Sequence, residues 1–176
     1  MGSGSGRVLS RALGAGVFAL IGFLAALPAT GQSTDEARTA ILATKIYLNQ
    51  LVRDPGAAEE LRSPGFRDVE PRALYVARWR RMVGDAGDMK RLAVSGVSFY
   101  GPEHSGREEM VAAVDFVSLT EEPRLICGSF VWGLGDEMPE LIREEVGMAE
   151  PYAVRGADRA QMEALVASLS CKMPPG

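Results

Sequence analysis

Apolar residues recur at helical spacing near both ends of the chain. In residues 34–53 the spaced positions are Ala37, Ile41, Leu48 and Leu51. In residues 158–170 they are Met162, Leu165, Val166 and Leu169. Asp158 and Gln161 also match a helix N-cap and the third residue after it. The pattern therefore predicts an N-terminal helix over about 34–53 and a C-terminal helix over about 158–170.

Two other stretches have a shorter helical pattern. One begins at Pro71, a favourable first helical position, and ends at Gly84, although its residues 74–79 are also compatible with a strand. The second covers residues 136–147, where the apolar positions are Leu141, Ile142 and Val146. We predict a short helix for each stretch.

The period of the pattern changes to two over residues 91–133. Three segments rich in valine and aromatic residues are separated by the polar stretches GPEHSGREE and TEEP; the segments are RLAVSGVSFY, MVAAVDFVSL and RLICGSFVWG. They predict a three-stranded antiparallel sheet. The predicted fold class is therefore α+β, with the N-terminal and C-terminal helices packed on that sheet.

The second hairpin predicts a sheet that is apolar on both faces. If TEEP is a four-residue loop, Leu119 pairs with Arg124. One face then carries Val114, Phe116, Cys127 and Val131, and the other carries Val111, Val117, Ile126, Phe130 and Trp132. Antiparallel sheets usually leave one face to water, so such a sheet needs helices on both sides, or a partner or ligand against one face.

Residues 1–31 have the layout of a secretory signal peptide. A basic start without acidic residues is followed by an apolar run over 13–27, a proline and small residues. We therefore predict a signal peptide over 1–31 and a single exported domain over 32–176. The alternative is an uncleaved membrane anchor, because the apolar stretch 12–29 is just long enough to span a bilayer.

The composition fits a small globular domain and excludes some partners. The chain has 176 residues, of which 47% are hydrophobic and 24% charged. Removing residues 1–31, which hold two arginines and no acid, makes the formal net charge of −4 still more negative. An acidic chain lacks the cationic surface that nucleic acid requires, and no glycine-rich nucleotide loop is present. We expect no nucleic-acid partner and no cofactor.

The two cysteines, Cys127 and Cys171, are predicted to form a disulfide, because paired cysteines in an exported domain are usually oxidised. Helix geometry adds a condition. On a continuous helix Cys171 would point away from Met162 and Leu169, so the helix must end by about Ser170. The alternative is that Cys127 is a small unbonded residue of the core.

Catalytic and metal motifs are weak. His104, the single histidine, lies between Glu103 and Ser105, but neighbours in a loop diverge and do not build a catalytic triad. One histidine and two paired cysteines leave too few ligands for zinc, so we expect no metal site. The adjacent acids Glu144 and Glu145 are predicted to face solvent.

Asp115 and a basic segment are the remaining candidates for a binding site. Asp115 lies opposite Gly128 on a predicted apolar face, so its carboxylate must be paired, hydrated or functional, with Arg78 as a candidate partner. The basic segment contains Trp79 and could bind an anionic surface, or show its cations to water while Trp79 enters the core. Its basic residues are Arg72, Arg78, Arg80, Arg81, Lys90 and Arg91.

These observations favour binding over catalysis. We expect a non-enzymatic, exported binding domain of the cell envelope, periplasmic or secreted, whose partner is an envelope protein or an anionic surface. The candidate binding residues are Arg78, Trp79, Arg81 and Asp115. Two alternatives stay open. One is a membrane-tethered accessory subunit that contacts the membrane through an uncleaved N-terminal segment, and the other is a small hydrolase or lyase that uses Asp115.

Overall fold

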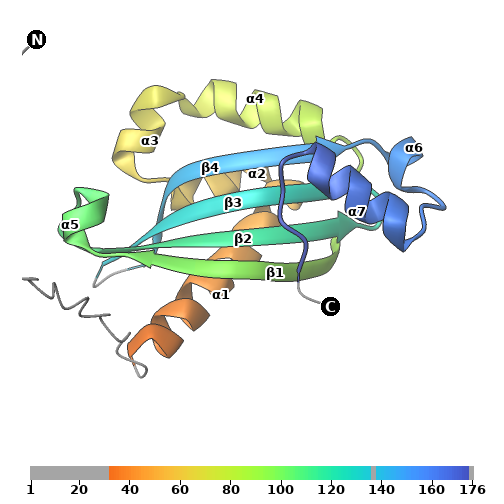
Figure 1. Cartoon of the computed structure of the whole chain (residues 1–176). Coiled ribbons are helices and arrows are strands. Elements are labelled where there is room, and N and C mark those ends of the chain that lie inside the picture. The colour runs from red at the N-terminus through yellow and green to blue at the C-terminus, as the bar shows by residue number, and fades with distance from the viewer. Residues whose placement is uncertain (1–31, 136–137, 175–176) are drawn as a thin grey trace, which may run out of the picture.

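The computed structural model describes residues 32–135 and 138–174, so the predicted signal peptide lies outside the described residues (Figure 1). The helices before the sheet are α1 (Gln32–Arg53), α2 (Pro55–Ala58), the 3-10 helix η1 (Glu59–Leu61), α3 (Pro64–Val69) and α4 (Arg72–Val83). The strands are β1 (Met89–Tyr100), β2 (Met110–Thr120), β3 (Leu125–Leu134) and β4 (Glu140–Ala149). The short helix α5 (Pro102–Ser105) joins β1 to β2, and α6 (Pro151–Val154) and α7 (Arg159–Ser168) follow β4.

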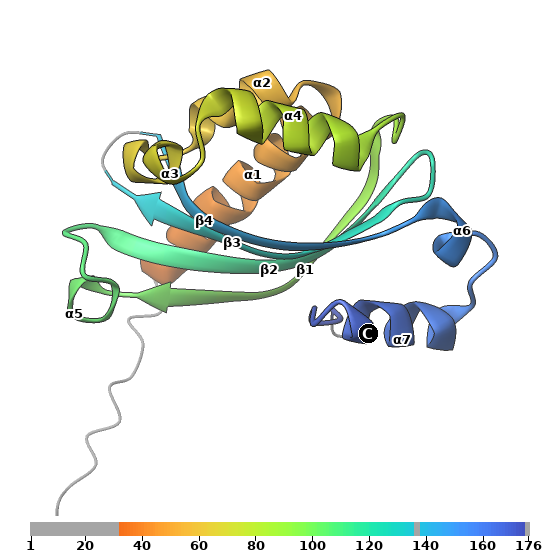
Figure 2. The same ribbon diagram turned by 90° about the horizontal axis from the view of Figure 1, so that it is seen from above.

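The strands form one antiparallel sheet in the order β1-β2-β3-β4, with helices on both of its faces (Figure 2). Helices α1 to α4 lie over one face, which we call the inner face. Helix α7 lies on the opposite side, the outer face, near one end of the strands. The predicted α+β class is confirmed, and the sheet has one strand more than predicted.

The core lies between α1, α4 and the inner face. Its aromatic centre is formed by Tyr47, Phe116, Phe130 and Trp132, all fully buried. The Tyr47 ring meets Phe130 edge-on, with the ring centroids 4.9 Å apart. Trp132 satisfies its indole N–H by donating to Thr44 Oγ1 at 2.9 Å. Burial of a large apolar side chain contributes about 1.5–3 kcal/mol, so Tyr47, with the buried Leu48 and Leu51, holds α1 on the sheet.

The predicted helix ends agree with the structure. The α7 helix begins at the expected capping box, in which Gln161 N–H donates to Asp158 Oδ1 at 2.8 Å. It stops before Ser170, a residue with φ of +59°, and Cys171 N–H then donates to the carbonyl of Val166 at 3.1 Å. The early end of α7 that the disulfide required is therefore confirmed. Gly84, with φ of +50°, ends α4 as expected.

The predicted helix over 136–147 is wrong, because Glu140–Ala149 forms the edge strand β4. An irregularity between Val131 and Trp132 shifts the pairing of β3 with β4. As a result the buried positions Leu141 and Glu144 are three residues apart instead of two, and one of them carries a charge. Both effects hide the strand period, and pairing with β3 outweighs the helical propensity of the segment.

The predicted register of the second hairpin is wrong by one residue. Its loop holds three residues, because Thr120 N–H donates to the carbonyl of Arg124 at 3.2 Å and Leu119 pairs with Leu125. A shift of one residue moves every β3 side chain to the other face. The inner face therefore carries Val114, Phe116, Ile126, Phe130 and Trp132, and the outer face carries Val111, Val117, Cys127 and Val131.

Candidate functional site

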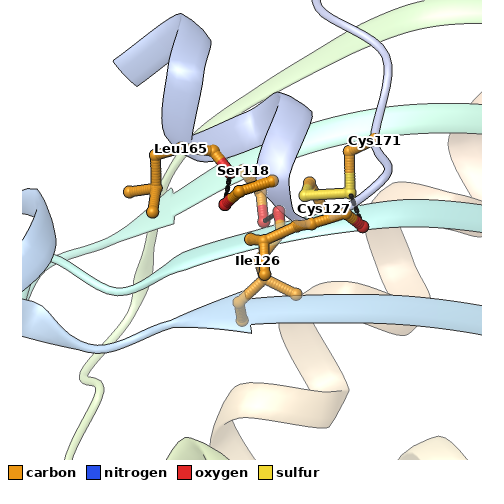
Figure 3. The surroundings of a disulfide bond; sticks show 7 residues. Ser118, Ile126, Cys127, Leu165 and Cys171 are labelled. Atoms are coloured by element: carbon orange, nitrogen blue, oxygen red, sulfur yellow. Dashed lines mark hydrogen bonds between the residues drawn. A yellow bond between two sulfur atoms is a disulfide. The ribbon is translucent and has the colours of Figure 1, made fainter. Parts of the chain in front are cut away.

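The outer face is covered at one end by α7. Val166 of α7 packs on Leu125 of β3, with Leu119, Met162 and Leu165 around them. The disulfide between Cys127 and Cys171 then fastens the tail that follows α7 to β3, with the two Cα atoms 6.0 Å apart (Figure 3). The predicted disulfide is confirmed, and it is the chemistry of an oxidising, exported location.

Beyond α7 the outer face is hollowed into a cleft. One part has a volume of about 480 Å³ and is bounded by all four strands and by the tail. A second part of about 400 Å³ continues toward α5 and shares Tyr100, Ala113, Ser129 and Glu145 with the first. We call the two parts together the outer cleft. Its other main lining residues are Ser98, Asp115, Val131, Ile142, Arg143, Leu169 and Lys172.

The register of the sheet places polar groups in a row across the floor of the outer cleft. Asp115 pairs with Gly96 on one side and Ser129 on the other, and Ser129 pairs with Glu145. Two strand spacings separate Asp115 from Glu145, so their backbones lie roughly 10 Å apart. The Asp115 carboxylate lies over Gly96, where a methyl group would be in ordinary van der Waals contact with Asp115 Oδ2, at 3.5 Å.

Both carboxylates of this row are paired with cations. Lys172 Nζ lies 2.5 Å from Asp115 Oδ2, and the Asp115 side chain is only 18% exposed. The hydrogen bond from Lys172 to Asp115, together with the Asp115 charge, raises the pKa of the lysine above its ordinary value. Glu145 pairs with Arg143 at the exposed edge. The outer cleft thus presents both signs of charge beside apolar walls, an arrangement suited to recognition.

The structure separates the predicted binding residues between the two sides of the sheet. Asp115 lies in the outer cleft, and its partner is Lys172, so the expected pairing with Arg78 is wrong. Arg78 instead donates to Glu70 at 2.7 Å and to Glu144 at 2.6 Å on the inner side. Trp79 is fully buried beside it.

The other predicted binding residue, Arg81, is exposed near the end of α4. It is therefore apart from the outer cleft as well as from the buried pair of Arg78 and Trp79. His104 is exposed in α5, where its Nδ1 lies 2.9 Å from Glu103 Oε1.

The expectation that Glu144 faces solvent is wrong. Its side chain is 6% exposed and accepts hydrogen bonds from Tyr47 at 2.7 Å and from Arg78 at 2.6 Å. Tyr47 also shares a hydrogen bond of 2.6 Å with Tyr75. Burial, then the Glu144 charge, raises the pKa of Tyr47 well above its ordinary value. This network fastens α1 and α4 to the edge strand β4.

Several residues of the outer cleft could not be identified from the sequence. Tyr100, Ser129 and Glu145 join the site only through the register of the four strands. One feature of the sequence pointed to Lys172. It follows Cys171, and the disulfide from Cys171 to Cys127 brings it over the outer face. Correct pairing of β2 with β3 would then have placed it near Asp115.

Over 32–135 and 138–174, no group of three or more His, Cys, Asp or Glu side chains is arranged to hold a metal ion. In the same residues, no helix combines the length and the apolar character needed to cross a membrane. Comparison of the chain with protein-family models, curated proteins and solved structures found no match.

Proposed function

We propose that this protein is a non-enzymatic, exported binding domain of the cell envelope that holds a segment of an envelope protein in the outer cleft. The observation that carries the proposal is the unequal covering of the sheet. Helices α1 to α4 cover the inner face, whereas α7 covers only one end of the outer face and leaves the cleft beside it. The protein is periplasmic or secreted in this proposal, in keeping with its disulfide and the predicted signal peptide over 1–31.

The lining of the outer cleft favours a protein segment as the partner. Ala113, Val131 and Ile142 offer apolar contact, and the Tyr100 ring is 44% exposed. Charged pairs at Asp115 and Glu145 stand beside these groups. Apolar contact with a few convergent polar groups is the usual composition of a binding pocket. A partner whose side chains alternate between apolar and polar would meet both.

Site-specific photo-crosslinking tests this assignment. A benzoylphenylalanine at position 100 lies in the outer cleft, and the matched control is the same substitution at Tyr152, which is 84% exposed outside the cleft. We expect irradiated cells to yield a crosslinked envelope protein from position 100 and not from position 152. Equal crosslinking at both positions, or none at position 100, would reject the outer cleft as the binding surface.

A blocking variant gives an independent test. Ala113→Trp would fill the centre of the outer cleft, whereas Val69→Trp adds the same side chain at a position that is 81% exposed on α3. We expect Ala113→Trp to lose the partner captured from envelope extracts and Val69→Trp to retain it. Thermal unfolding of both variants shows whether the loss reflects the cleft or the fold.

An enzymatic function is the second candidate, and one observation supports it. Asp115 is mostly buried, yet it lines the outer cleft next to Ser129 on the neighbouring strand. A carboxylate so placed could act as a general base in a small hydrolase or lyase. Asp115→Asn tests this candidate on any activity found, together with a pH–rate profile. Unchanged activity in the variant rejects it.

A membrane-tethered accessory subunit is the remaining proposal for the N-terminal segment. It depends on retention of the apolar stretch in residues 1–31. Intact-mass measurement of the protein recovered from cells distinguishes the two outcomes. A mass lacking residues 1–31 supports the signal peptide, and a full-length mass in the membrane fraction supports the anchor.

A further inference from the structure

Strand β1 is an edge strand of the sheet, and no other described strand pairs with its free edge. It pairs only with β2, and Figure 1 shows it as the outermost strand, crossed by α1. In the part of the chain that the structure describes, no backbone hydrogen bond joins this edge to another segment. At the opposite edge, by contrast, Ser63 N–H donates to the carbonyl of Leu141 in β4 at 2.8 Å. An antiparallel edge strand points every second residue's N–H and C=O outward. Because the pairing of β1 is irregular between Met89 and Arg91 and between Val94 and Gly96, the free groups lie on the regular stretches 91–94 and 96–100.

A groove of about 430 Å³ follows this edge between β1 and α1. One wall is formed by Ile41, Lys45 and Asn49 on successive turns of α1. The other wall is formed by Met89, Lys90, Arg91, Leu92 and Val94. Leu92 packs on the inner core, whereas Arg91 pairs with Leu119, which packs on the outer face. The wall therefore includes residues of both faces and reaches the edge of the strand. A helix beside an open strand edge is a geometry in which proteins bind extended peptides.

Three cations of the groove form no ion pair in the described part of the chain. Among the described residues, Lys45, Lys90 and Arg91 form no ion pair with an acidic side chain. Two acids lie near this end of β1. Asp88 is bound by Arg53 through two hydrogen bonds of 2.6 Å each, and Glu121 accepts from the Asp88 N–H at 3.3 Å. The groove is also lined by Ile41, Leu92 and Val94, each half-buried.

We propose that this groove binds an extended acidic segment of a partner protein, which adds to the free edge of β1 as a further strand. The backbone of β1 supplies hydrogen bonds, and the three cations select carboxylate side chains over neutral or basic ones. The groove lies outside the outer cleft, with which it shares no lining residue. This second binding surface therefore does not depend on the function proposed for the cleft.

Fluorescence anisotropy with designed peptides tests both parts of the proposal. The probe is a fluorescein-labelled synthetic peptide of alternating glutamate and valine, and the first control replaces glutamate by lysine. We expect the acidic peptide to bind at least about tenfold tighter than the basic one, with affinity falling as salt is added. No measurable binding of the acidic peptide, or equal binding of the two, overturns the proposal.

A second control isolates strand addition. N-methylation of alternate residues of the acidic peptide removes backbone donors and keeps every charge. We expect this peptide to lose about tenfold or more in affinity, because the edge of β1 then lacks partners. Unchanged affinity would mean that the groove only attracts negative charge, and strand addition would be rejected.

Charge reversal locates the site. Lys90→Glu combined with Arg91→Glu changes the groove, and Arg80→Glu combined with Arg81→Glu makes the same charge change on the exposed side of α4. We expect the first pair to lose about tenfold or more of the acidic-peptide affinity and the second to stay within about twofold. Equal losses would show a general charge effect and overturn the assignment. If the first pair fails to fold, Lys90→Gln with Arg91→Gln replaces it.

Two other occupants are distinguished by the same proteins. A dimer in size-exclusion chromatography that the groove variant abolishes would show that a second copy of this chain occupies the edge. Binding to phosphatidylglycerol vesicles that only the groove variant loses, without peptide binding, would show a lipid surface instead. Either result overturns the acidic segment.

Discussion

The hydroxyl of Tyr47 lies 2.7 Å from Glu144 Oε2, which joins the first helix to the last strand. The same carboxylate accepts from Arg78 at 2.6 Å and from Trp79 at 3.3 Å. A buried carboxylate is costly unless its oxygens are satisfied, and here three donors from α1 and α4 meet it. The edge strand β4 is thus held by its side chains as well as by its pairing with β3.

We predict that Glu144→Gln destabilises the protein and that Glu145→Gln does not. The two residues are adjacent on β4, but Glu144 is 6% exposed and Glu145 is 61% exposed. Replacing the buried carboxylate removes charge-assisted hydrogen bonds, which costs about 1.5–3 kcal/mol in the free energy of unfolding. The exposed change stays within about 0.5 kcal/mol. Urea unfolding of both variants measures the difference, and equal midpoints would contradict the role assigned to Glu144.

The buried tyrosines predict a loss of stability at alkaline pH. Burial raises the pKa of Tyr47 and of Tyr75 in the folded protein, whereas an unfolded tyrosine ionises near pH 10. The folded state therefore keeps these protons at a pH where the unfolded state releases them. This contribution to stability is complete below about pH 10 and is lost as the pH rises above it toward the raised pKa.

Two measurements check this pH dependence. Absorbance of the tyrosinate band should show that at least two of the four tyrosines ionise only when the chain unfolds. The control is Tyr47→Phe, which we expect to be less stable at neutral pH but to lose less stability between about pH 10 and pH 12. Ionisation of all four tyrosines in the folded protein would contradict the prediction.

The elements predictable from the sequence are those whose local pattern agrees with their tertiary packing. Helix α7 begins at a capping box and repeats its apolar residues over the whole element, so both signals agree. Helix α1 repeats Ile41, Leu48 and Leu51 in the same way. In strand β4 the local pattern and the tertiary packing disagree. One of its inward-facing residues is Glu144, whose carboxylate is hydrogen-bonded by Tyr47 and Arg78, residues far away in the sequence.

The candidate site was predictable to a smaller extent. Asp115 stands out in the sequence because a carboxylate on an apolar strand needs an explanation. Its partner Lys172 is 57 positions away in a stretch with no pattern of its own. Two features bring these residues together, namely the disulfide and the pairing register of β2 with β3. That register depends on a hairpin loop of three residues instead of the predicted four.

We predict that the disulfide contributes measurably to the free energy of unfolding. Cys127 and Cys171 are 44 positions apart, and closing a loop of that length stabilises the folded state by about 4 kcal/mol in the chain-entropy model. We expect the double variant Cys127→Ala, Cys171→Ala and the reduced wild-type protein to lose similar amounts in urea unfolding. Thiol labelling of unfolded, unreduced protein should find no free cysteine. Labelling at both positions would contradict the bond.

Reduction should also open the outer cleft. The tail from Leu169 to Lys172 forms one wall of the cleft, and the bond at Cys171 is its covalent attachment to β3. Without the bond, the ion pair between Lys172 and Asp115 involves a lysine that is 72% exposed, and such pairs are weak. We expect reduction to accelerate hydrogen exchange more in the tail than in α1, because the tail loses its attachment in addition to the general loss of stability. Equal acceleration in both segments would mean that reduction acts only through global stability, and local opening of the tail would be rejected.

We predict that position 128 does not tolerate even alanine in place of glycine. Its φ is +155°, and a methyl group there would overlap the backbone carbonyl of Glu145 on β4. Because the obstacle is backbone, neither strand can yield without breaking the β3–β4 pairing. We expect Gly128→Ala to lower the free energy of unfolding by about 3 kcal/mol or more, measured by urea unfolding.

The control is Gly65→Ala, where a methyl group has no neighbour within 4 Å and the helix α3 should tolerate it. A wild-type midpoint in Gly128→Ala would mean that β4 does not approach β3 as closely as its pairing requires.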